Sequence, residues 1–258
     1  MRPLLLALLA VTLAACGPDR ERSAAQADAD PALSVVTDSL IADDPALRYA
    51  VRIAYPQVAA EGGALPAPVR AANAAIRDTL AAFARSFRPE SAPPPEDSLF
   101  RVDVQGGVDG AFLGDGVFSA LVDVYAYTGG AHGVTVFQPL TVDLRTGRAL
   151  RTADLFAPGA PYGDVLATWV ERAVVDALAR QLGTTREDAR RTVFYDAGLD
   201  RLRAGEADVT LGSDSLRVHV PPYQLAAYAA GPFHVGVPYA ALAEVARPGG
   251  PLARLAED

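Results

Sequence analysis

The chain has 258 residues, of which 50% are apolar, and its formal net charge at pH 7 is −8. This length suits one large domain or two small ones, and the apolar fraction is ample for a packed core. An acidic chain with no basic stretch argues against nucleic acid as a partner and against electrostatic docking to anionic lipid, whereas a basic protein or a carbohydrate stays open.

The first sixteen residues have the pattern of a lipoprotein signal peptide. Arg2 precedes an apolar run over residues 4–15, which is shorter than the roughly 20 residues that cross a bilayer. The small residues before Cys16 resemble the bacterial lipobox, in which the chain is cut before a cysteine that is then lipidated. Cys16 is the only cysteine, which excludes a disulfide or a thiolate metal site. We predict a lipid anchor at Cys16; the alternative is an ordinary secretory signal whose cysteine is incidental.

Composition and apolar spacing divide the rest of the chain. Residues 16–44 are rich in Ala, Asp, Arg, Pro and Ser with little periodicity, which predicts a flexible tether. Alternation over residues 49–55 predicts a strand that Pro56 ends, and spacings of three and four over 69–87 predict a helix. A proline-rich loop follows. The predicted organisation is a signal peptide (1–15), a tether (16–44), a small domain (45–95) and a larger domain (96–258).

The larger predicted domain mixes strands and helices without a regular alternation. Period-two patterns predict strands over residues 100–105, 118–126, 134–144, 209–211, 216–220 and 233–237, with a hairpin turn at Thr146 and Gly147. Helical spacing predicts a long helix over 164–182 that Gly183 ends, a shorter one behind the capping pair Thr184 and Glu187, and a last one around Leu242 and Val245.

This order of elements favours an α+β fold with a mainly antiparallel sheet packed against two longer helices. The fold is either a single compact unit or two small, closely packed subdomains.

The histidines are the first candidates for chemistry. His219 and His234 each lie between two apolar residues, so we expect both to point away from the apolar faces of their strands. Together with His132 they could form a zinc site, but their spacing matches no metal motif. The sequence also has no Gly-x-Ser-x-Gly elbow, and its scattered carboxylates designate no acid–base pair. We therefore predict no metal, no cofactor and no catalytic residue.

A glycine-rich bend and a pair of tyrosines are the candidate binding residues. Gly129, Gly130 and His132 follow Tyr127, while Tyr223 and Tyr228 lie in a later segment. Glycines permit positive φ in a tight connection between strands, and tyrosines can pack on a sheet with the hydroxyl at its edge. The functional alternative is a pair of recognition loops, since a tyrosine offers a rigid ring with a polar tip.

Both segments resemble a known family. The first reads YTGGAHG at residues 127–133, and the second reads PYQLAAYAAGP at residues 222–232. Their order resembles the extracytoplasmic domain of unknown function at the C-terminus of the anti-sigma factor RsiV. Residues 49–87 are similar to the smaller domain that precedes it there and in the peptidoglycan deacetylase PdaC. The family has an acidic residue before its Pro-Tyr pair, where this chain has Val220 and Pro221, so a contact that depends on that acid is not expected here.

The resemblance implies an extracytoplasmic module, which in RsiV is similar to a receptor for lysozyme. We therefore expect a non-enzymatic lipoprotein of the bacterial cell envelope, in the outer membrane if the cell has two. Its partner is expected to be a lysozyme-like protein or a cell-wall glycan. A structural or assembly role in the envelope and a cell-wall hydrolase are the alternatives.

Overall fold

A computed structural model describes residues 32–92 and 100–257 of the chain. In the described residues the strands are β1 (Leu33–Asp44), β2 (Tyr49–Ala60), β3 (Val102–Gly114), β4 (Val117–Tyr127), β5 (Val134–Asp143), β6 (Arg148–Ala149), β7 (Asp208–Leu211), β8 (Ser215–Val220) and β9 (Phe233–Pro238). The α-helices are α1 (Ala67–Arg85), α2 (Tyr162–Leu182), α3 (Arg186–Thr192), α4 (Asp196–Arg203) and α5 (Pro251–Glu257). Short 3₁₀ turns are η1 (Thr152–Leu155), η2 (Tyr228–Ala230) and η3 (Tyr239–Leu242). The predicted α+β class is confirmed.

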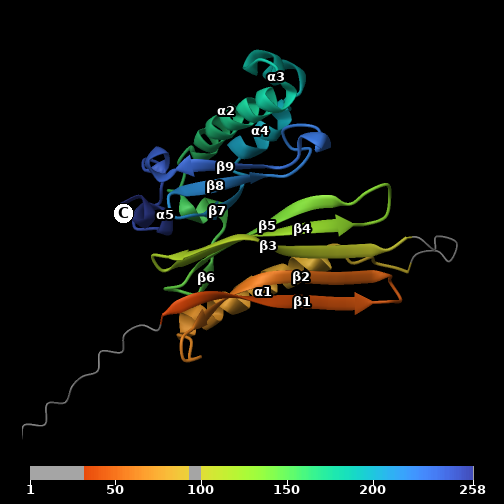
Figure 1. Ribbon diagram of the computed structural model, residues 1–258. Helices are drawn as coiled ribbons and strands as arrows, with labels where there is room; N and C mark the ends of the chain where they lie inside the picture. The colour runs from red at the N-terminus through yellow and green to blue at the C-terminus, as the bar shows by residue number, and fades with distance from the viewer. Residues whose placement is uncertain (1–31, 93–99, 258) are drawn as a thin grey trace, which may run out of the picture. The chain divides into compact units, whose positions relative to one another are not determined.

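The first six strands form one sheet in chain order, β1-β2-β3-β4-β5-β6 (Figure 1). Every neighbouring pair is antiparallel except β2 and β3, which run parallel over the five residues Tyr49–Ile53. Two parallel strands need a crossover rather than a hairpin, and α1 lies in that connection. The sheet is therefore mainly antiparallel, as the sequence predicts.

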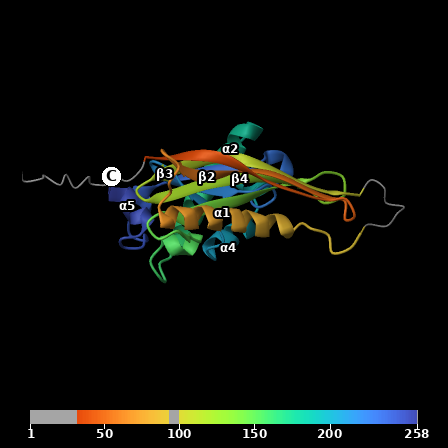
Figure 2. The same ribbon diagram turned by 90° about the horizontal axis from the view of Figure 1, so that it is seen from below.

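The helix α1 covers one face of this sheet (Figure 2). Its apolar stripe is buried and comprises Val69, Ala72, Ile76, Leu80 and Ala84. Spacings of three and four residues place these side chains on one side of a helix. With the inward residues of β2 to β5 they form the first core, to which Val51, Val104 and Phe118 also belong.

Strand β1 corrects the predicted tether, because residues 33–44 pair with all of β2 in antiparallel register. Most of their side chains are exposed, since β1 is an edge strand, and this explains why they show so little apolar periodicity. The Tyr55 hydroxyl also donates a hydrogen bond of 2.9 Å to the Asp38 carboxylate across the two strands. The predicted signal peptide, Cys16 and the rest of the tether up to residue 31 lie outside the described residues.

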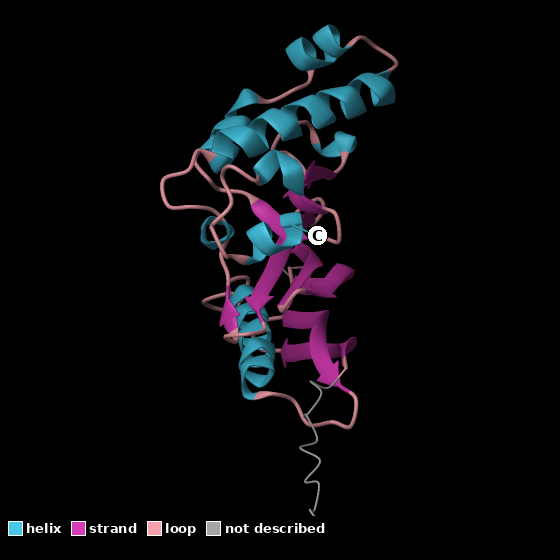
Figure 3. Cartoon of the chain, turned by 90° about the vertical axis from the view of Figure 1, so that its left-hand side faces the viewer, coloured by secondary structure: helices cyan, strands magenta, loops and turns pink. Residues whose placement is uncertain are grey.

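The second region is built on the three-stranded antiparallel sheet β7-β8-β9. Helix α2 and shorter helices pack with this sheet around one core (Figure 3). Gly183 has φ 63° at the C-terminal end of α2, a left-handed conformation that glycine adopts without steric cost. Residues from α2, α4, the small sheet and α5 form the second core, among them Leu166, Val218 and Leu252.

The two hydrophobic cores do not change over at residue 95, where the sequence predicts a boundary. Strands β3, β4 and β5 share the first core with β2 and α1, so the change from one core to the other follows β6. The two regions are also joined by buried polar contacts. The Ser119 hydroxyl of β4 lies 2.8 Å from the Thr141 hydroxyl of β5 and accepts a 2.9 Å hydrogen bond from the backbone N–H of Leu211 in β7.

Several predicted element ends shift for local reasons. Strand β2 continues through Pro56 because its ladder with β3 stops at Ile53, so no N–H is needed there on that side. Helix α3 is capped by Thr185 rather than Thr184, since the Thr185 hydroxyl accepts from the Asp188 N–H. The last predicted helix is replaced by η3 and α5, and the sequence analysis missed α4.

None of the helices in the described residues is both long enough and apolar enough to span a bilayer.

Candidate functional site

Three aromatic rings from the two family-like segments meet on the surface of the protein. The centroids of the Tyr223 and Tyr228 rings are 5.4 Å apart, and the His132 ring lies 5.1 Å from that of Tyr228. The planes are tilted by 36° and 32° respectively. We call these three residues the aromatic cluster. The structure thus joins two segments that contain the candidate binding residues predicted from the sequence and that lie about ninety residues apart.

The aromatic cluster is accessible to a partner. Tyr223 is 53% exposed and Tyr228 is 37% exposed, so neither ring is packed into the core. Both rings therefore keep surface that a partner can contact. Exposed large aromatic rings that lie next to one another are typical of recognition surfaces, because they desolvate easily and lose little side-chain entropy on binding.

Glycines and backbone hydrogen bonds shape the bend that presents His132. Gly129 and Gly130 have φ of 88° and 120°, which supports the structural interpretation of these glycines. The Tyr127 hydroxyl donates to the Gly130 carbonyl at 2.9 Å, and His132 Nδ1 lies 2.8 Å from the Gly133 carbonyl oxygen. Tyr127 and the glycines thus hold the bend in shape, and His132 is the side chain through which the bend contributes to the aromatic cluster.

Tyr125 fixes the other end of the bend. Its hydroxyl accepts a 2.9 Å hydrogen bond from the Gly133 N–H. A Cβ at position 133 would lie 2.5 Å from the Tyr125 ring, so this approach requires a glycine. Tyr125 is 44% exposed and extends the polar edge of the surface near His132.

The second segment is anchored at its middle and exposed at its ends. Leu225 is fully buried in the second core, and its carbonyl accepts a 2.9 Å hydrogen bond from the Tyr195 N–H. Tyr223 has φ 71°, a left-handed conformation that is an outlier for a bulky residue. Such strain persists only where the surroundings hold the backbone in place, and it recurs at functional positions.

His219 and His234 form a second polar group: both lie on the side of their strands opposite the apolar residues, as predicted, but only His234 is exposed. They are paired residues of the neighbouring strands β8 and β9, with 2.8 Å between their Nδ1 atoms. His219 is 4% exposed, because this face of the small sheet packs against Phe137 of β5, whose ring centroid is 6.0 Å away. Its Nε2 lies 2.8 Å from the Thr210 hydroxyl.

The Thr210–His219 pair is poorly suited to nucleophilic catalysis. Burial, with the charges of His234 and Arg217, lowers the pKa of His219 to about 3. A general base works best when its pKa lies near the operating pH, so His219 would take a proton from Thr210 only weakly. Thr210 is itself 5% exposed. The pair is better understood as a hydrogen-bonded element of the contact between the two sheets.

Asp123 of β4 lies near His234. Its Oδ1 atom is buried without a hydrogen-bond partner in the described residues. Burial and the charge of Asp109 raise the pKa of its carboxyl, while His234 lowers it. Within residues 32–92 and 100–257, no three His, Cys, Asp or Glu side chains are grouped as a metal site requires.

One further feature is absent from the sequence predictions, namely a cavity that Arg151 and Asp208 line. Its walls come from α1, β5, η1 and β7, which are far apart in the chain. No local motif marks it, so only the tertiary arrangement could have revealed it.

Comparison with known protein families gives one match, which lies in the second region. Residues 153–240 match the family described as "Protein of unknown function (DUF3298)". This range contains the Tyr223–Tyr228 segment and both histidines of the pair, but not the bend at residues 127–133. No curated protein shows significant similarity to the chain.

Two solved structures share the fold. The first is a crystal structure of a member of the DUF3298 family from Bacteroides fragilis, with a TM-score of 0.58, 14% identity, and coverage of 89% of this chain and 99% of that one. The second is a DUF3298 family protein from Pseudomonas aeruginosa, with a TM-score of 0.54, 16% identity, and coverage of 86% and 96%. At such identities the likeness concerns the fold alone.

Proposed function

We propose that this chain is a non-enzymatic lipoprotein of the bacterial cell envelope that captures an extracytoplasmic partner through the aromatic cluster. The observation that supports a binding role is the meeting of His132, Tyr223 and Tyr228, from two distant segments, on an exposed surface. Tyrosines in such positions commonly contribute most of the binding energy of an interface.

A protein partner of basic charge is the first candidate. The chain has a net charge of −8, which attracts a basic protein and speeds its association. The resemblance of the YTGGAHG and PYQLAAYAAGP segments to the RsiV ectodomain favours a lysozyme-like partner. The loss of the acidic residue before Pro222 means that any contact depending on it would be made differently here.

A cell-wall glycan is the second candidate, and the spacing of the rings favours it. Successive rings with centroids 5.4 Å and 5.1 Å apart offer several faces along which a chain of sugars could stack. The experiment below therefore includes both ligands.

The binding test measures capture of lysozyme and of purified peptidoglycan by the full-length protein and three variants, Tyr223→Ala, Tyr228→Ala and His132→Ala. We expect each variant to lose affinity for the same ligand by about tenfold or more while its melting temperature stays close to the parent's. Tyr195→Ala is the matched control, because Tyr195 is 42% exposed but makes no ring contact with the cluster in the described residues. Equal capture by parent and cluster variants would refute the proposal.

The membrane anchor needs its own test. We propose that Cys16 is lipidated, and two acyl chains on one residue are enough for stable anchoring. Cys16→Ser should leave the precursor uncut or release the protein into the soluble fraction. Normal processing of this variant together with membrane retention would contradict the anchor.

A further inference from the structure

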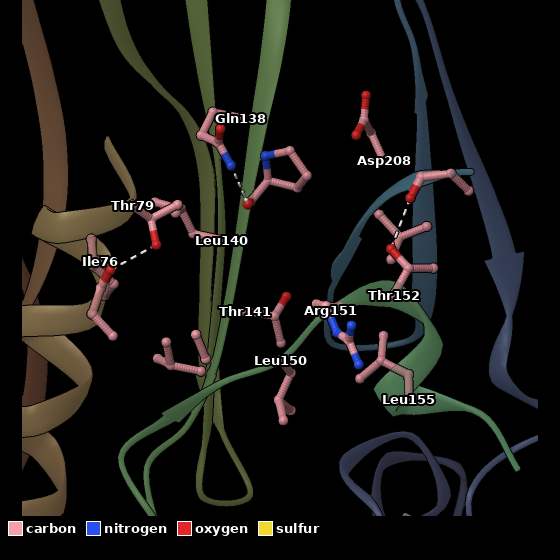
Figure 4. A pocket seen from close by; sticks show the side chains of 16 residues that line it. Ile76, Thr79, Gln138, Leu140, Thr141, Leu150, Arg151, Thr152, Leu155 and Asp208 are labelled. Carbon is pink, nitrogen blue, oxygen red and sulfur yellow. Dashed lines mark hydrogen bonds between the residues drawn. The ribbon is translucent and has the colours of Figure 1, made fainter. Parts of the chain in front are cut away.

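A cavity of about 310 Å³ lies between α1, β5, η1 and β7, and it shares no residue with the aromatic cluster (Figure 4). Ile76 and Thr79 of α1 line one side of it, Gln138 and Leu140 of β5 lie at its middle, and Thr152 and Asp208 lie opposite. The volume is at the lower end of what small-molecule sites show, roughly 300 to 1,000 Å³. It is therefore suited to a small ligand.

The lining combines aliphatic side chains with a few polar groups. Ile76, Leu140, Leu150 and Leu155 provide apolar surface from both regions of the protein. Two of the polar side chains already have partners, since the Thr79 hydroxyl donates to the Ala75 carbonyl and the Thr152 hydroxyl donates to the Ala207 carbonyl, both at 2.8 Å. The charged groups of the cavity are therefore the ones that can select a ligand.

Asp208 is the first of these charged groups. It begins β7 and is half-buried, and no hydrogen bond or ion pair of its carboxylate is found within the described part of the chain. Burial raises the pKa of this carboxyl, and the charge of Arg201 lowers it by less. Arg201 itself is paired with Glu206 at 3.0 Å. A desolvated carboxylate without a direct partner costs stability, so a cationic ligand would relieve that cost.

Arg151 is the second charged group. Its Nε lies 3.4 Å from Asp154 Oδ2, and that carboxylate also accepts from the Arg151 N–H at 2.9 Å. The Arg151 side chain is 86% exposed, and no hydrogen bond donated by its two terminal nitrogens is found among the described residues. Those nitrogens offer the forked donors that match a carboxylate.

The same two residues also line a neighbouring cavity of about 430 Å³. Four residues are shared between the two cavities, namely Arg151, Thr152, Ala207 and Asp208. The opposite charges thus lie where two cavities adjoin, so a ligand can reach them while its apolar part occupies the 310 Å³ cavity.

From this arrangement we infer that the cavity binds a small zwitterion, namely an amino acid or short peptide with an aliphatic side chain. Its ammonium group is held by Asp208, its carboxylate by Arg151, and its side chain lies against Ile76, Leu140 and Leu155. Neither a simple cation nor a simple anion uses both charged groups, and neither fills the apolar part of the cavity.

The test is a calorimetric titration of the full-length protein with alanyl-leucine and two capped forms, N-acetyl-alanyl-leucine and alanyl-leucinamide. We expect the free dipeptide to bind. Each capped form should bind at least about tenfold more weakly, because each lacks one charged contact. Failure of the dipeptide to bind at millimolar concentration, or equal binding of all three peptides, would overturn the inference.

Variants assign the two ends of the ligand. Asp208→Asn should weaken the free dipeptide by about tenfold but leave the N-acetyl form unchanged, whereas Arg151→Gln should weaken the dipeptide but not the amide. Asp43→Asn and Arg52→Gln are matched controls on the exposed surface of β1 and β2. Unchanged dipeptide affinity in both cavity variants would contradict the assignment. Because Asp208→Asn removes a desolvated charge, its melting temperature should not fall, and the capped peptides test the parent protein independently of any variant.

Discussion

The region built on the six-stranded sheet bonds the side chains of Asn73 and Tyr55 within itself, whereas Asp208 in the region built on β7-β9 faces a cavity. The exception in the first region is Asp123, whose buried Oδ1 has no hydrogen-bond partner in the described residues. In the first region Asn73 bonds both backbone groups of Val58, and Tyr55 bonds Asp38. In the second, the Asp208 carboxylate has no direct partner in the described residues. Unpartnered carboxylates lower stability, and they are the groups that a ligand can use.

The surface features follow the same division. Tyr223 and Tyr228 belong to the second region, and Leu225 between them is buried in its core. The first region contributes His132 through the bend between β4 and β5. The candidate sites therefore lie where the second region meets the first, and the DUF3298 match at residues 153–240 covers the second region's share of them.

The largest expected effect separates stability from binding. Leu225→Ala and Leu80→Ala each remove a fully buried side chain, one from each core, and each should lower the free energy of unfolding by about 2–5 kcal/mol. Only Leu225→Ala should also weaken capture through the aromatic cluster, because Leu225 anchors the Tyr223–Tyr228 segment. Chemical denaturation and a capture assay measure the two effects. Equal loss of capture in both variants would mean that the segment depends on global stability instead.

Asn73, a polar residue of the first region, should contribute nearly as much to the free energy of unfolding as a buried leucine of the core. The Asn73 side chain accepts from the Val58 N–H at 2.9 Å and donates to the Val58 carbonyl at 2.8 Å. Asn73→Ala leaves both half-buried groups unpaired and should cost about 2–3 kcal/mol in denaturant unfolding. Thr79→Ala is the control on the same helix, since its hydroxyl bonds only the preceding turn. A comparable loss of stability in both variants would show that the hydrogen bonds of Asn73 to Val58 add no more stability than an ordinary helix-surface contact.

The buried histidine should make the stability of the protein depend on pH. The folded-state pKa of His219 is about 3, below the unfolded value near 6.5, so between these values the unfolded chain binds more protons. Its stability contribution is therefore full above pH 6.5 and falls as the pH drops toward 3, by up to about 1.4 kcal/mol per pH unit.

This dependence is measured by comparing unfolding free energies at pH 7 and pH 5 in the parent and in His219→Asn. The variant should lose less stability between the two pH values than the parent. A steeper loss in the variant would contradict the lowered pKa.

The smallest expected effect concerns the strained tyrosine. Tyr223 has φ 71°, so Tyr223→Gly should be more stable than Tyr223→Ala by about 1 kcal/mol, because only glycine adopts this conformation without steric cost. The glycine variant should still lose partner capture, since it lacks the ring. Alanine and glycine variants of equal stability would show that the backbone relaxes there.

The sequence predicted the elements whose side chains obey one period over their whole length. The stripe of α1 and the alternation in β9 are readable because burial on one side repeats at a fixed spacing. The edge strand β1 escaped, because most of its side chains are exposed and its order comes from backbone hydrogen bonds that composition does not show. The short helix α4 escaped because only Gly198, Leu199 and Leu202 of its eight residues are buried.

The sequence by itself determined the α+β class, the acidic charge, and the two tyrosine- and glycine-rich segments that the structure brings together. Only the tertiary structure decided that His219 is buried against Phe137, that Asp208 and Arg151 share a cavity, and that the first core continues to β5. Those features depend on contacts between elements distant in the chain. Local spacing fixes the side of a strand on which a residue lies, but not which element covers that side.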